Sequence, residues 1–319
     1  MPFPLKNPLP FENDLVKLYE ELEEKQRTGR KSEIEKALRK FDEAKGKVYS
    51  NLNPYQRVQL ARHLDRPTSI TLIKFLIDDF IELHGDRRFG DDPAIICGLG
   101  KIGQFRVVIV AQEKGGSLKE KTLRNFGMPQ PEGYRKALRL FRLAEKFELP
   151  IITIIDTPGA YPGDEAEERG QAQAIAENLL ELSSITVPVI GVLLSEGGSG
   201  GALALGIVDR LFMFENAYYS VISPEGCASI LFGEEAQKYV GKCAEMLKIT
   251  SENLYRFKIV DEIIKEPLGG LQWGYEESFR MLKDRILATL AELSRITVEE
   301  LLERRRIRYY SIGAFEQYG

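Results

Sequence analysis

Ser195-Glu196-Gly197-Gly198-Ser199-Gly200-Gly201-Ala202 is the stretch that decides the fold. It follows an apolar segment, Val187 to Leu194, that is typical of a buried strand, and it precedes a helix-like segment, Ala202 to Ile207. Because glycine has no Cβ, Gly200 and Gly201 can let an oxygen atom reach their backbone N–H groups beside the positive end of a helix dipole. The stretch predicts an oxyanion-binding turn, with a purely steric role of the glycines as the alternative.

A second glycine turn, Asp156-Thr157-Pro158-Gly159-Ala160-Tyr161-Pro162-Gly163, has the same setting. It follows a β-branched strand candidate, Pro150 to Ile155, and precedes a predicted helix from Glu165 to Leu182. The loops that leave the carboxyl ends of parallel strands form the ligand crevice of an α/β sheet. Both glycine turns should therefore face the same side of the sheet, which we interpret as the active side.

Composition excludes several classes of protein. The chain has 319 residues, of which 43% are apolar, enough for one large domain with appendages. Its net charge of -4 argues against a generally cationic nucleic-acid binder. Cys97, Cys227 and Cys243 form no C-x-x-C pair, so we expect reduced cysteines and no cysteine zinc site. Met1 to Asp14 has no secretory pattern, and no segment approaches the roughly 20 apolar residues that span a bilayer, so we expect a soluble cytoplasmic protein.

Charged segments with helical periodicity lie near both ends of the chain. Leu15 to Gln26 and Ser32 to Val48 predict a helical hairpin, which is either a solvated appendage or a grip on a partner chain. Glu276 to Leu293 and Thr297 to Arg308 predict two closing helices. The run Arg304-Arg305-Arg306 suits the negative end of the last helix dipole.

The intervening pattern is that of an α/β domain from about Pro67 to Glu266 with right-handed crossovers. Its first part predicts a helix over Thr68 to Leu83, then a hairpin around Gly103 formed by strands Ala94 to Leu99 and Arg106 to Gln112. A glycine-containing loop over Lys114 to Gly133 follows. The other expected elements are a helix over Tyr134 to Phe147 and strands over Leu211 to Phe214 and Tyr218 to Ile222.

The residue inventory limits the chemistry. The chain has two histidines, His63 and His84, and neither adjoins a glycine turn in sequence. An Asp/Arg pair holding a helix end explains His84-Gly85-Asp86-Arg87 better than a functional cluster does. P-loop and dinucleotide-binding motifs are absent, and Ser199, which lies between glycines, has no credible histidine partner. Backbone electrostatics is therefore favoured over a serine nucleophile.

The segment from Lys114 to Lys146 contains nine basic residues against three acidic ones. This balance predicts a locally positive field that suits an anionic ligand or an acidic partner. The alternative is a basic helix face that is exposed to solvent and binds no ligand, which explains the same excess of basic residues.

Five motifs resemble, in order, those of the carboxyltransferase α subunit of bacterial acetyl-CoA carboxylase. The motifs are Arg124-Asn125-Phe126-Gly127-Met128-Pro129, Pro131-Glu132-Gly133-Tyr134-Arg135-Lys136-Ala137-Leu138-Arg139, Asp156-Thr157-Pro158-Gly159-Ala160-Tyr161-Pro162, Glu196-Gly197-Gly198-Ser199-Gly200-Gly201-Ala202 and Ser223-Pro224-Glu225-Gly226-Cys227-Ala228. The resemblance covers about Leu64 to Gly270 closely. One departure is Ala111-Gln112-Glu113-Lys114-Gly115-Gly116-Ser117-Leu118, where many relatives carry His-Gln-Lys-Gly, and no function is assigned to this loop.

The resemblance implies a crotonase-like (ClpP/crotonase) α/β fold of repeated ββα units, with an N-terminal helical extension (1–60) and a carboxyltransferase domain with C-terminal helices (61–319). It also implies an α2β2 heterotetramer with a β subunit, working with biotin carboxylase and the biotin carboxyl carrier protein. The expected reaction moves a carboxyl group from carboxybiotin on that carrier to acetyl-CoA, giving malonyl-CoA, the first committed step of fatty acid synthesis. No metal is expected on this chain, since the family carries its zinc on the β subunit.

By the same resemblance, the Gly200 and Gly201 amides form the oxyanion hole for biotin, and no histidine base is needed. In crotonase-like proteins such a glycine begins a helix that ends at an aspartate before the next strand, here Asp209. Expected substrate-binding residues are Gly197, Gly198, Pro158, Gly159, Ala160, Ser223, Pro224, Glu225 and Gly226, with an N-cap role as the alternative for Ser223.

Gly201→Val is expected to stop carboxyl transfer without disturbing assembly, because the new side chain would crowd the oxyanion position rather than the core. Two other functions remain open at this point. One is a self-sufficient crotonase-like acyl-CoA decarboxylase or hydratase, and the other is a non-catalytic scaffold.

Overall fold

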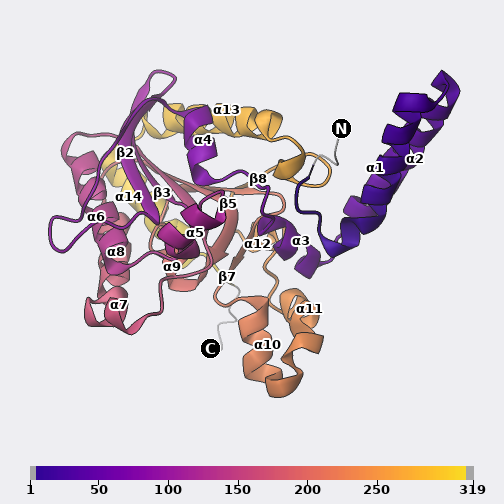
Figure 1. Ribbon diagram of the computed structural model, residues 1–319. Helices are drawn as coiled ribbons and strands as arrows, with labels where there is room; N and C mark the ends of the chain where they lie inside the picture. The colour runs from indigo at the N-terminus through magenta and orange to yellow at the C-terminus, as the bar shows by residue number, and fades with distance from the viewer. Residues whose placement is uncertain (1–4, 314–319) are drawn as a thin grey trace, which may run out of the picture.

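A computed structural model of the chain describes residues 5–313 and has an eight-stranded mixed sheet at its centre (Figure 1). Residues 1–4 and 314–319, the outer ends of the two expected domains, lie outside the described residues. The strands are β1 (Asp78–Glu82), β2 (Ile95–Ile102), β3 (Phe105–Gln112), β4 (Ile151–Thr157), β5 (Val189–Gly198), β6 (Arg210–Phe214), β7 (Tyr218–Ser220) and β8 (Glu262–Ile264).

The strand order places the carboxyl ends of the central strands together. The sheet runs β1-β2-β3-β4-β5-β6-β8, and β7 pairs with β5 beyond the end of β6. β1, β2 and β3 are antiparallel neighbours, whereas β3, β4, β5, β6 and β8 are parallel. The predicted hairpin around Gly103, which has a φ of +56°, is confirmed, as is the α/β class. The loops after β3, β4 and β5 therefore leave one edge of the sheet.

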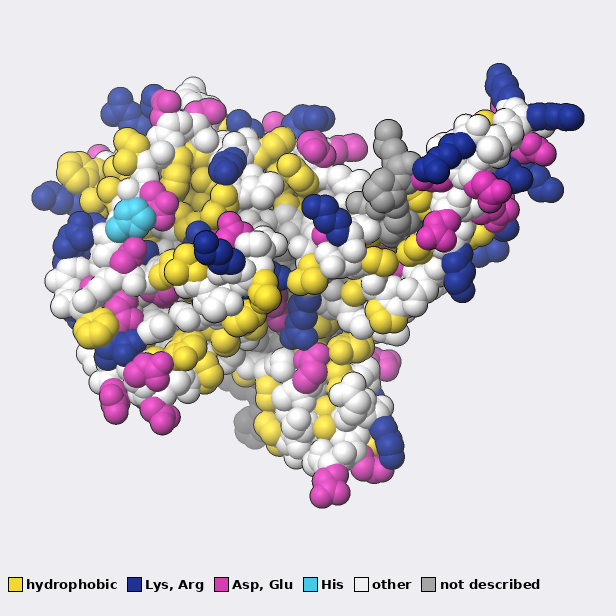
Figure 2. All heavy atoms as spheres, in the orientation of Figure 1, with side chains coloured by type: hydrophobic (Ala, Val, Ile, Leu, Met, Phe, Trp, Pro, Cys, Tyr) yellow, Lys and Arg dark blue, Asp and Glu magenta, His cyan; other side chains and the backbone are white. Residues whose placement is uncertain are grey.

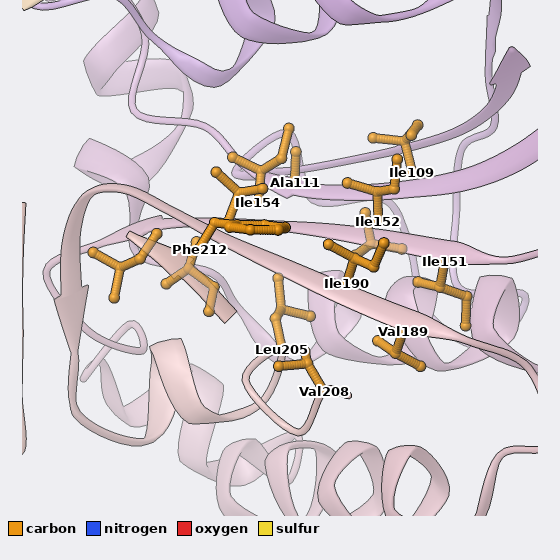
Figure 3. Packing of buried hydrophobic residues seen from close by; sticks show 14 of the residues in the cluster. Ile109, Ala111, Ile151, Ile152, Ile154, Val189, Ile190, Leu205, Val208 and Phe212 are labelled. Atoms are coloured by element: carbon orange, nitrogen blue, oxygen red, sulfur yellow. The ribbon is translucent and has the colours of Figure 1, made fainter. Parts of the chain in front are cut away.

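The core is centred on β-branched residues of the parallel strands. Ile152 of β4 is in register with Ile109 of β3 and Ile190 of β5, so three buried isoleucines form a row across the sheet (Figure 3). All residues of β4 and β5 are buried, which is typical of parallel strands covered on both faces. Full burial of each such side chain stabilises the fold by about 1.5–3 kcal/mol.

Helices cover the sheet and extend beyond it. In Figure 1, α4 and α13 lie above the strands, whereas α10 and α11 project below them. The helices are α1 (Asn13–Thr28), α2 (Lys31–Ser50), α3 (Pro54–Ala61), α4 (Ser69–Leu76), α5 (Leu118–Leu123), α6 (Pro131–Lys146), α7 (Asp164–Glu168), α8 (Gln171–Ser184), α9 (Ser199–Leu203), α10 (Pro224–Phe232), α11 (Ala236–Met246), α12 (Ser251–Arg256), α13 (Glu276–Leu293) and α14 (Val298–Tyr310). Short 3-10 turns occur at Pro10–Glu12, Asn125–Gly127, Gly233–Glu235 and Leu271–Trp273.

The predicted helical hairpin is confirmed as α1 and α2, which extend away from the body of the molecule (Figure 1). Charged side chains of both signs cover it in Figure 2, while Leu22 and Phe41 belong to its own small apolar cluster. Two hydrogen bonds of the buried Tyr49 side chain attach the hairpin to the rest of the molecule. The Tyr49 hydroxyl donates to Glu12 Oε1 at 2.5 Å and accepts from Trp273 Nε1 at 3.1 Å.

Two predicted helices are wrong in extent. The helix expected over Thr68 to Leu83 ends at Leu76, because Ile77 already has an extended backbone and Asp78 to Glu82 pair with β2 as β1. The helix expected over Glu165 to Leu182 is divided into α7 and α8, because Gly170 has a φ of +83°. Strand pairing ends the first helix and the positive φ of Gly170 divides the second, and helical periodicity detects neither.

Elements around the glycine stretches also differ from their predicted bounds. The strand expected to end at Leu194 continues to Gly198, and the strand expected to reach Ile222 ends at Ser220. The helix expected over Ala202 to Ile207 is α9, which ends six residues before Asp209. The loop expected over Lys114 to Gly133 contains α5. Pairing of β7 with the end of β5 explains the longer strand.

Arg305 in α14 is an internal anchor, so the expectation that its run serves only a helix C-terminus is wrong for this residue. Its side chain is 1% exposed and makes two 2.8 Å hydrogen bonds to the Asp209 carboxylate. It also donates to carbonyl oxygens at the end of α8 and the start of β5, those of Leu182, Ile185 and Val187. Asp209 in turn accepts from the Val189 N–H at 2.7 Å.

Arg305→Met is expected to lower the free energy of unfolding by about 3–5 kcal/mol, because it leaves the buried Asp209 carboxylate without its cation. Urea unfolding followed by circular dichroism measures the loss. Arg306→Met is the matched control, since Arg306 is exposed and pairs with Glu303 one turn away. Equal unfolding midpoints for the two variants would contradict the anchoring role.

Candidate active site

The two glycine turns pack against each other backbone to backbone. A Cβ on Gly198 would overlap the Pro158 carbonyl oxygen, and a Cβ on Gly201 would lie 2.5 Å from the Ala160 nitrogen. No side chain fits at either position, so the close approach itself requires glycine. The prediction that both turns face the same side of the sheet is confirmed.

The chain turns from β5 into α9 at Ser199, which has a strained φ of +50°. Gly197 and Gly198 are the last residues of β5, so they do not lie in the turn where the sequence placed them. Gly200 and Gly201 lie in the first turn of α9, where backbone N–H groups have no acceptor within the helix. This position suits hydrogen bonding to an oxyanion.

An apolar cavity of about 390 Å³ lies beside the start of α9. Of the expected site residues, only Gly200 lines it, together with the neighbouring Ser199. A Cβ built on Gly200 would meet only Ile175, at 3.8 Å, so the space next to this residue is open. The apolar residues of the lining include Leu203, Ile207, Leu211, Tyr219, Leu254 and Ile259.

The second expected segment, Ser223 to Gly226, begins α10 and does not line this cavity. Ser223 Oγ accepts from the Gly226 N–H at 3.0 Å, and Pro224 occupies the first helical turn. The N-cap alternative for Ser223 is therefore confirmed. The Glu225 carboxylate accepts from Arg62 at 2.9 Å, which links α10 to α3.

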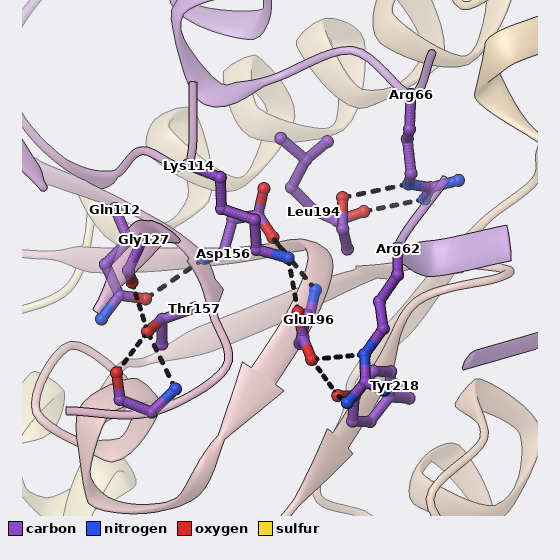
Figure 4. Close-up of polar contacts among 12 residues, drawn as sticks. Arg62, Arg66, Gln112, Lys114, Gly127, Asp156, Thr157, Leu194, Glu196 and Tyr218 are labelled. Atoms are coloured by element: carbon purple, nitrogen blue, oxygen red, sulfur yellow. Dashed lines mark hydrogen bonds and ion pairs between the residues drawn. The ribbon is translucent and has the colours of Figure 1, made fainter. Parts of the chain in front are cut away.

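A buried ionic cluster adjoins the glycine turns (Figure 4). Lys114 Nζ lies 2.8 Å from Asp156 Oδ1 and 2.7 Å from Glu196 Oε2. Arg62 Nε donates to Glu196 Oε1 at 2.8 Å, and the Tyr218 hydroxyl donates to the same oxygen. The carboxylates end β4 and β5, and Lys114 follows β3. Sequence patterns did not single out this cluster, although a charge within two residues of the end of each expected strand is a usable signal for three of its members.

The environment keeps Glu196 ionised. Burial raises its pKa, but the cations of Lys114 and Arg62 outweigh burial and lower the pKa to about 2. Burial raises the pKa of Asp156, which is opposed by Lys114. Burial lowers the pKa of Lys114, whereas Asp156 and Glu196 raise it above its ordinary value. Glu196 is therefore a poor general base and a strong acceptor for its partners.

The turn after β4 is also hydrogen-bonded to the Asn125–Gly127 turn. The Thr157 hydroxyl donates to the Gly127 carbonyl oxygen at 2.6 Å, and the Gly159 N–H donates to Thr157 Oγ1 at 3.0 Å. Asn125 and Phe126, directly before Gly127, have φ values of +48° and +56°. These contacts connect the strained Asn125–Gly127 turn to the glycine turn after β4.

Part of the predicted positive field is compensated within the molecule. Arg135 pairs with Asp86 at 2.8 Å, Lys136 with Asp91 at 2.5 Å, and Arg142 with Glu181 at 3.0 Å. Asp86 also accepts from three backbone N–H groups of its own loop, so its role is structural, but the expected Asp86–Arg87 pair at a helix end is wrong, because the cation is Arg135 and the segment lies between β1 and β2. Within residues 5–313, no group of three or more candidate ligands could hold a metal ion. No helix in the same range is long and apolar enough to cross a membrane.

Comparisons with known proteins identify relatives along nearly the whole chain. The family model described as acetyl co-enzyme A carboxylase carboxyltransferase-like matches residues 8–313. Acetyl-coenzyme A carboxylase carboxyl transferase subunit alpha of Campylobacter concisus is 45% identical over 98% of this chain and 100% of its own length. The protein of the same name from Staphylococcus saprophyticus is 51% identical over 85% of this chain and 86% of its own length.

Solved structures share the fold at low sequence identity. Transcarboxylase 12S with hydrolysed methylmalonyl-coenzyme A superposes with a TM-score of 0.52 and 22% identity, covering 66% of this chain and 40% of that chain. The β subunit of P. aeruginosa geranyl-CoA carboxylase superposes with a TM-score of 0.55 and 16% identity, covering 72% of this chain and 42% of that chain. These similarities confirm the expected crotonase-like fold.

Gly201→Ala is expected to lower the free energy of unfolding by about 1–3 kcal/mol, because its Cβ would push into the Gly159–Ala160 backbone. The earlier expectation for Gly201→Val is corrected on the same ground, since the added atoms meet the neighbouring turn. Gly200→Ala is the control and should retain wild-type stability, because its Cβ has space. Urea unfolding of both variants checks this contrast, and equal midpoints would refute it.

Glu196→Gln is expected to lower the free energy of unfolding by about 3–5 kcal/mol at neutral pH, because Lys114 and Arg62 lose a buried anion. A carboxylate with a lowered pKa stabilises the fold above its ordinary pKa of 4.5, and this contribution disappears as the pH falls toward about 2. Unfolding measured across that pH range should therefore bring wild type and variant together at the acidic end.

Glu225→Gln is the matched control for this change. Glu225 shares the Arg62 partner, but its side chain is 40% exposed, so its loss should cost less than about 1 kcal/mol. A constant difference between wild type and Glu196→Gln at every pH would show that the ionised carboxylate is not the stabilising group.

Proposed function

Because this chain belongs to the acetyl-CoA carboxylase carboxyltransferase family, we propose that it is the α half of a split enzyme that carboxylates acetyl-CoA to malonyl-CoA. The observation that carries the proposal is the start of α9, where Gly200 presents a first-turn amide beside an apolar cavity. Backbone donors at such a place stabilise negative charge that develops on an oxygen atom during a reaction. The first step of fatty acid synthesis would then depend on this site.

Carboxybiotin, attached to a separate biotin carboxyl carrier protein, would supply the activated carboxyl group. The residues present suit it, because the cavity adjoins Gly200 and no Cβ blocks the approach to that amide. Gly200 and Gly201 would donate hydrogen bonds to the biotin oxygen as charge develops there. The surrounding apolar side chains exclude water, which strengthens each hydrogen bond.

The described lining of the cavity contains no histidine, aspartate or glutamate. This chain would therefore contribute oriented donors rather than a general base. Pro158, Gly159 and Ala160 would act through the packing of their turn against α9. Gly197, Gly198 and the Ser223–Gly226 segment would shape the surroundings of the site rather than contact the reacting atoms.

Several further assignments rest on family membership. The partners would be a β subunit in an α2β2 heterotetramer, biotin carboxylase and the carrier protein, with acetyl-CoA bound between the subunits. Zinc would belong to the β subunit, since the three cysteines of this chain are scattered in sequence. We further propose that residues 1–60 form an extension to the carboxyltransferase domain of residues 61–319, and that the protein acts in the cytoplasm.

Malonyl-CoA-dependent carboxylation of free biotin, the reverse reaction, is expected only when this chain is co-purified with its β subunit. Each subunit alone should show no turnover, because neither holds both halves of the site. In the mixture, Gly200→Val should lower kcat by about 10²- to 10³-fold with assembly preserved, because the side chain would occupy the open space beside the donor. Size-exclusion chromatography checks assembly.

Other outcomes would replace the proposal. Turnover by the isolated chain would favour a self-sufficient acyl-CoA enzyme. A complex without any turnover would favour a scaffold. Near-normal kcat of Gly200→Val would exclude Gly200 as an oxyanion donor.

A further inference from the structure

The Gln112 side chain donates a hydrogen bond to a backbone carbonyl of α9 that has no partner within the helix. In this single-turn helix the Ala204 N–H donates to the Gly200 oxygen at 3.0 Å, and the Leu205 N–H donates to the Ala202 oxygen at 3.2 Å. The Gly201 carbonyl between them accepts instead from Gln112 Nε2 at 2.7 Å. Gln112 is fully buried at the end of β3, so this hydrogen bond is shielded from water.

The other end of the same amide holds the second glycine turn. Gln112 Oε1 accepts from the Asp156 N–H at 3.1 Å, at the point where β4 runs into that turn. A carbonyl oxygen only accepts and a backbone N–H only donates, so the two partners determine the orientation of the amide. One side chain from β3 therefore ties the Gly201 backbone to the Asp156 backbone, and Figure 4 shows the contact with Asp156.

A one-turn helix needs such external support. Five residues are too few for a helix that is stable by itself, and α9 begins at the strained Ser199. The backbone packing of Gly201 against Ala160 limits how closely α9 approaches the second turn. This packing does not prevent the first turn of α9 from rotating. A directional hydrogen bond to the Gly201 carbonyl resists that rotation.

We propose that Gln112 is a positioning residue, which sets the direction of the Gly200 and Gly201 N–H groups without touching substrate. It does not line the cavity beside α9. The catalytic consequence of this inference rests on the proposed function. Misplacing an oriented donor by about 1 Å can lower the reaction rate by about 10²-fold.

The test uses the co-purified complex and two substitutions of Gln112. Gln112→Met keeps an unbranched side chain but removes both hydrogen bonds, and should lower kcat of the reverse reaction by about 10- to 100-fold with an unchanged KM for malonyl-CoA. Gln112→His should recover most of that loss, because neutral imidazole offers one donor and one acceptor nitrogen. Recovery by this variant separates positioning from simple loss of a packed side chain.

Val110→Ala is the matched control. Val110 lies on the same strand and is fully buried, so this substitution lowers Tm without removing the contact to α9. Its kcat should stay at the wild-type value. Wild-type kcat in Gln112→Met, or an equal fall in kcat for Val110→Ala, would overturn the proposal.

Hydrogen exchange in the isolated chain gives a readout that is independent of turnover. Gln112→Met should accelerate exchange of the backbone amides in residues 199–205, whereas Gln112→His and Val110→Ala should leave it near the wild-type rate. If the wild-type complex is inactive, the proposed function fails, and this measurement still decides the role of Gln112. Unchanged exchange in Gln112→Met would overturn it.

Discussion

The contact between two backbone turns is the constraint on which the rest of this structure depends. Gly198 lies against the Pro158 carbonyl and Gly201 against the Ala160 nitrogen, at distances that exclude any side chain. Such an approach requires β4 and β5 to be parallel neighbours whose carboxyl ends lie at the same height. The buried, β-branched strands provide this arrangement, and the helix that follows β5 then presents its first N–H groups at the edge of the sheet.

Buried polar groups hold this edge, and they differ in what they can contribute to chemistry. Glu196 is surrounded by cations, so its low pKa makes it a structural anion rather than a proton acceptor. Lys114 and Asp156 complete the same cluster. Gln112 is neutral and reaches both turns through one amide. Desolvation of these groups is offset by specific partners, which also makes the geometry of the edge rigid.

Distant parts of the chain stabilise the same region from outside. Arg62, directly after α3, contacts Glu196 on β5 and Glu225 on α10, so it joins three elements around the sheet edge. Arg305 of α14 binds Asp209 at the start of β6 and carbonyl oxygens near the start of β5. The cavity beside Gly200 is bounded by elements held in this way. A site that relies on backbone donors needs such support, because its groups have no side-chain rotamers with which to adjust.

The sequence by itself determined the elements that depend on local pattern. Glycine runs after β-branched segments predicted the two turns and their common side, and helical periodicity predicted α1, α2 and α13. The tertiary structure alone decided which glycine faces a cavity, where strand pairing after Leu76 or the positive φ of Gly170 ends a helix, and which charges are anchors. Periodicity reports neighbours within a few residues, whereas Arg62 and Glu196 are separated by 134 positions and meet only after the sheet has formed.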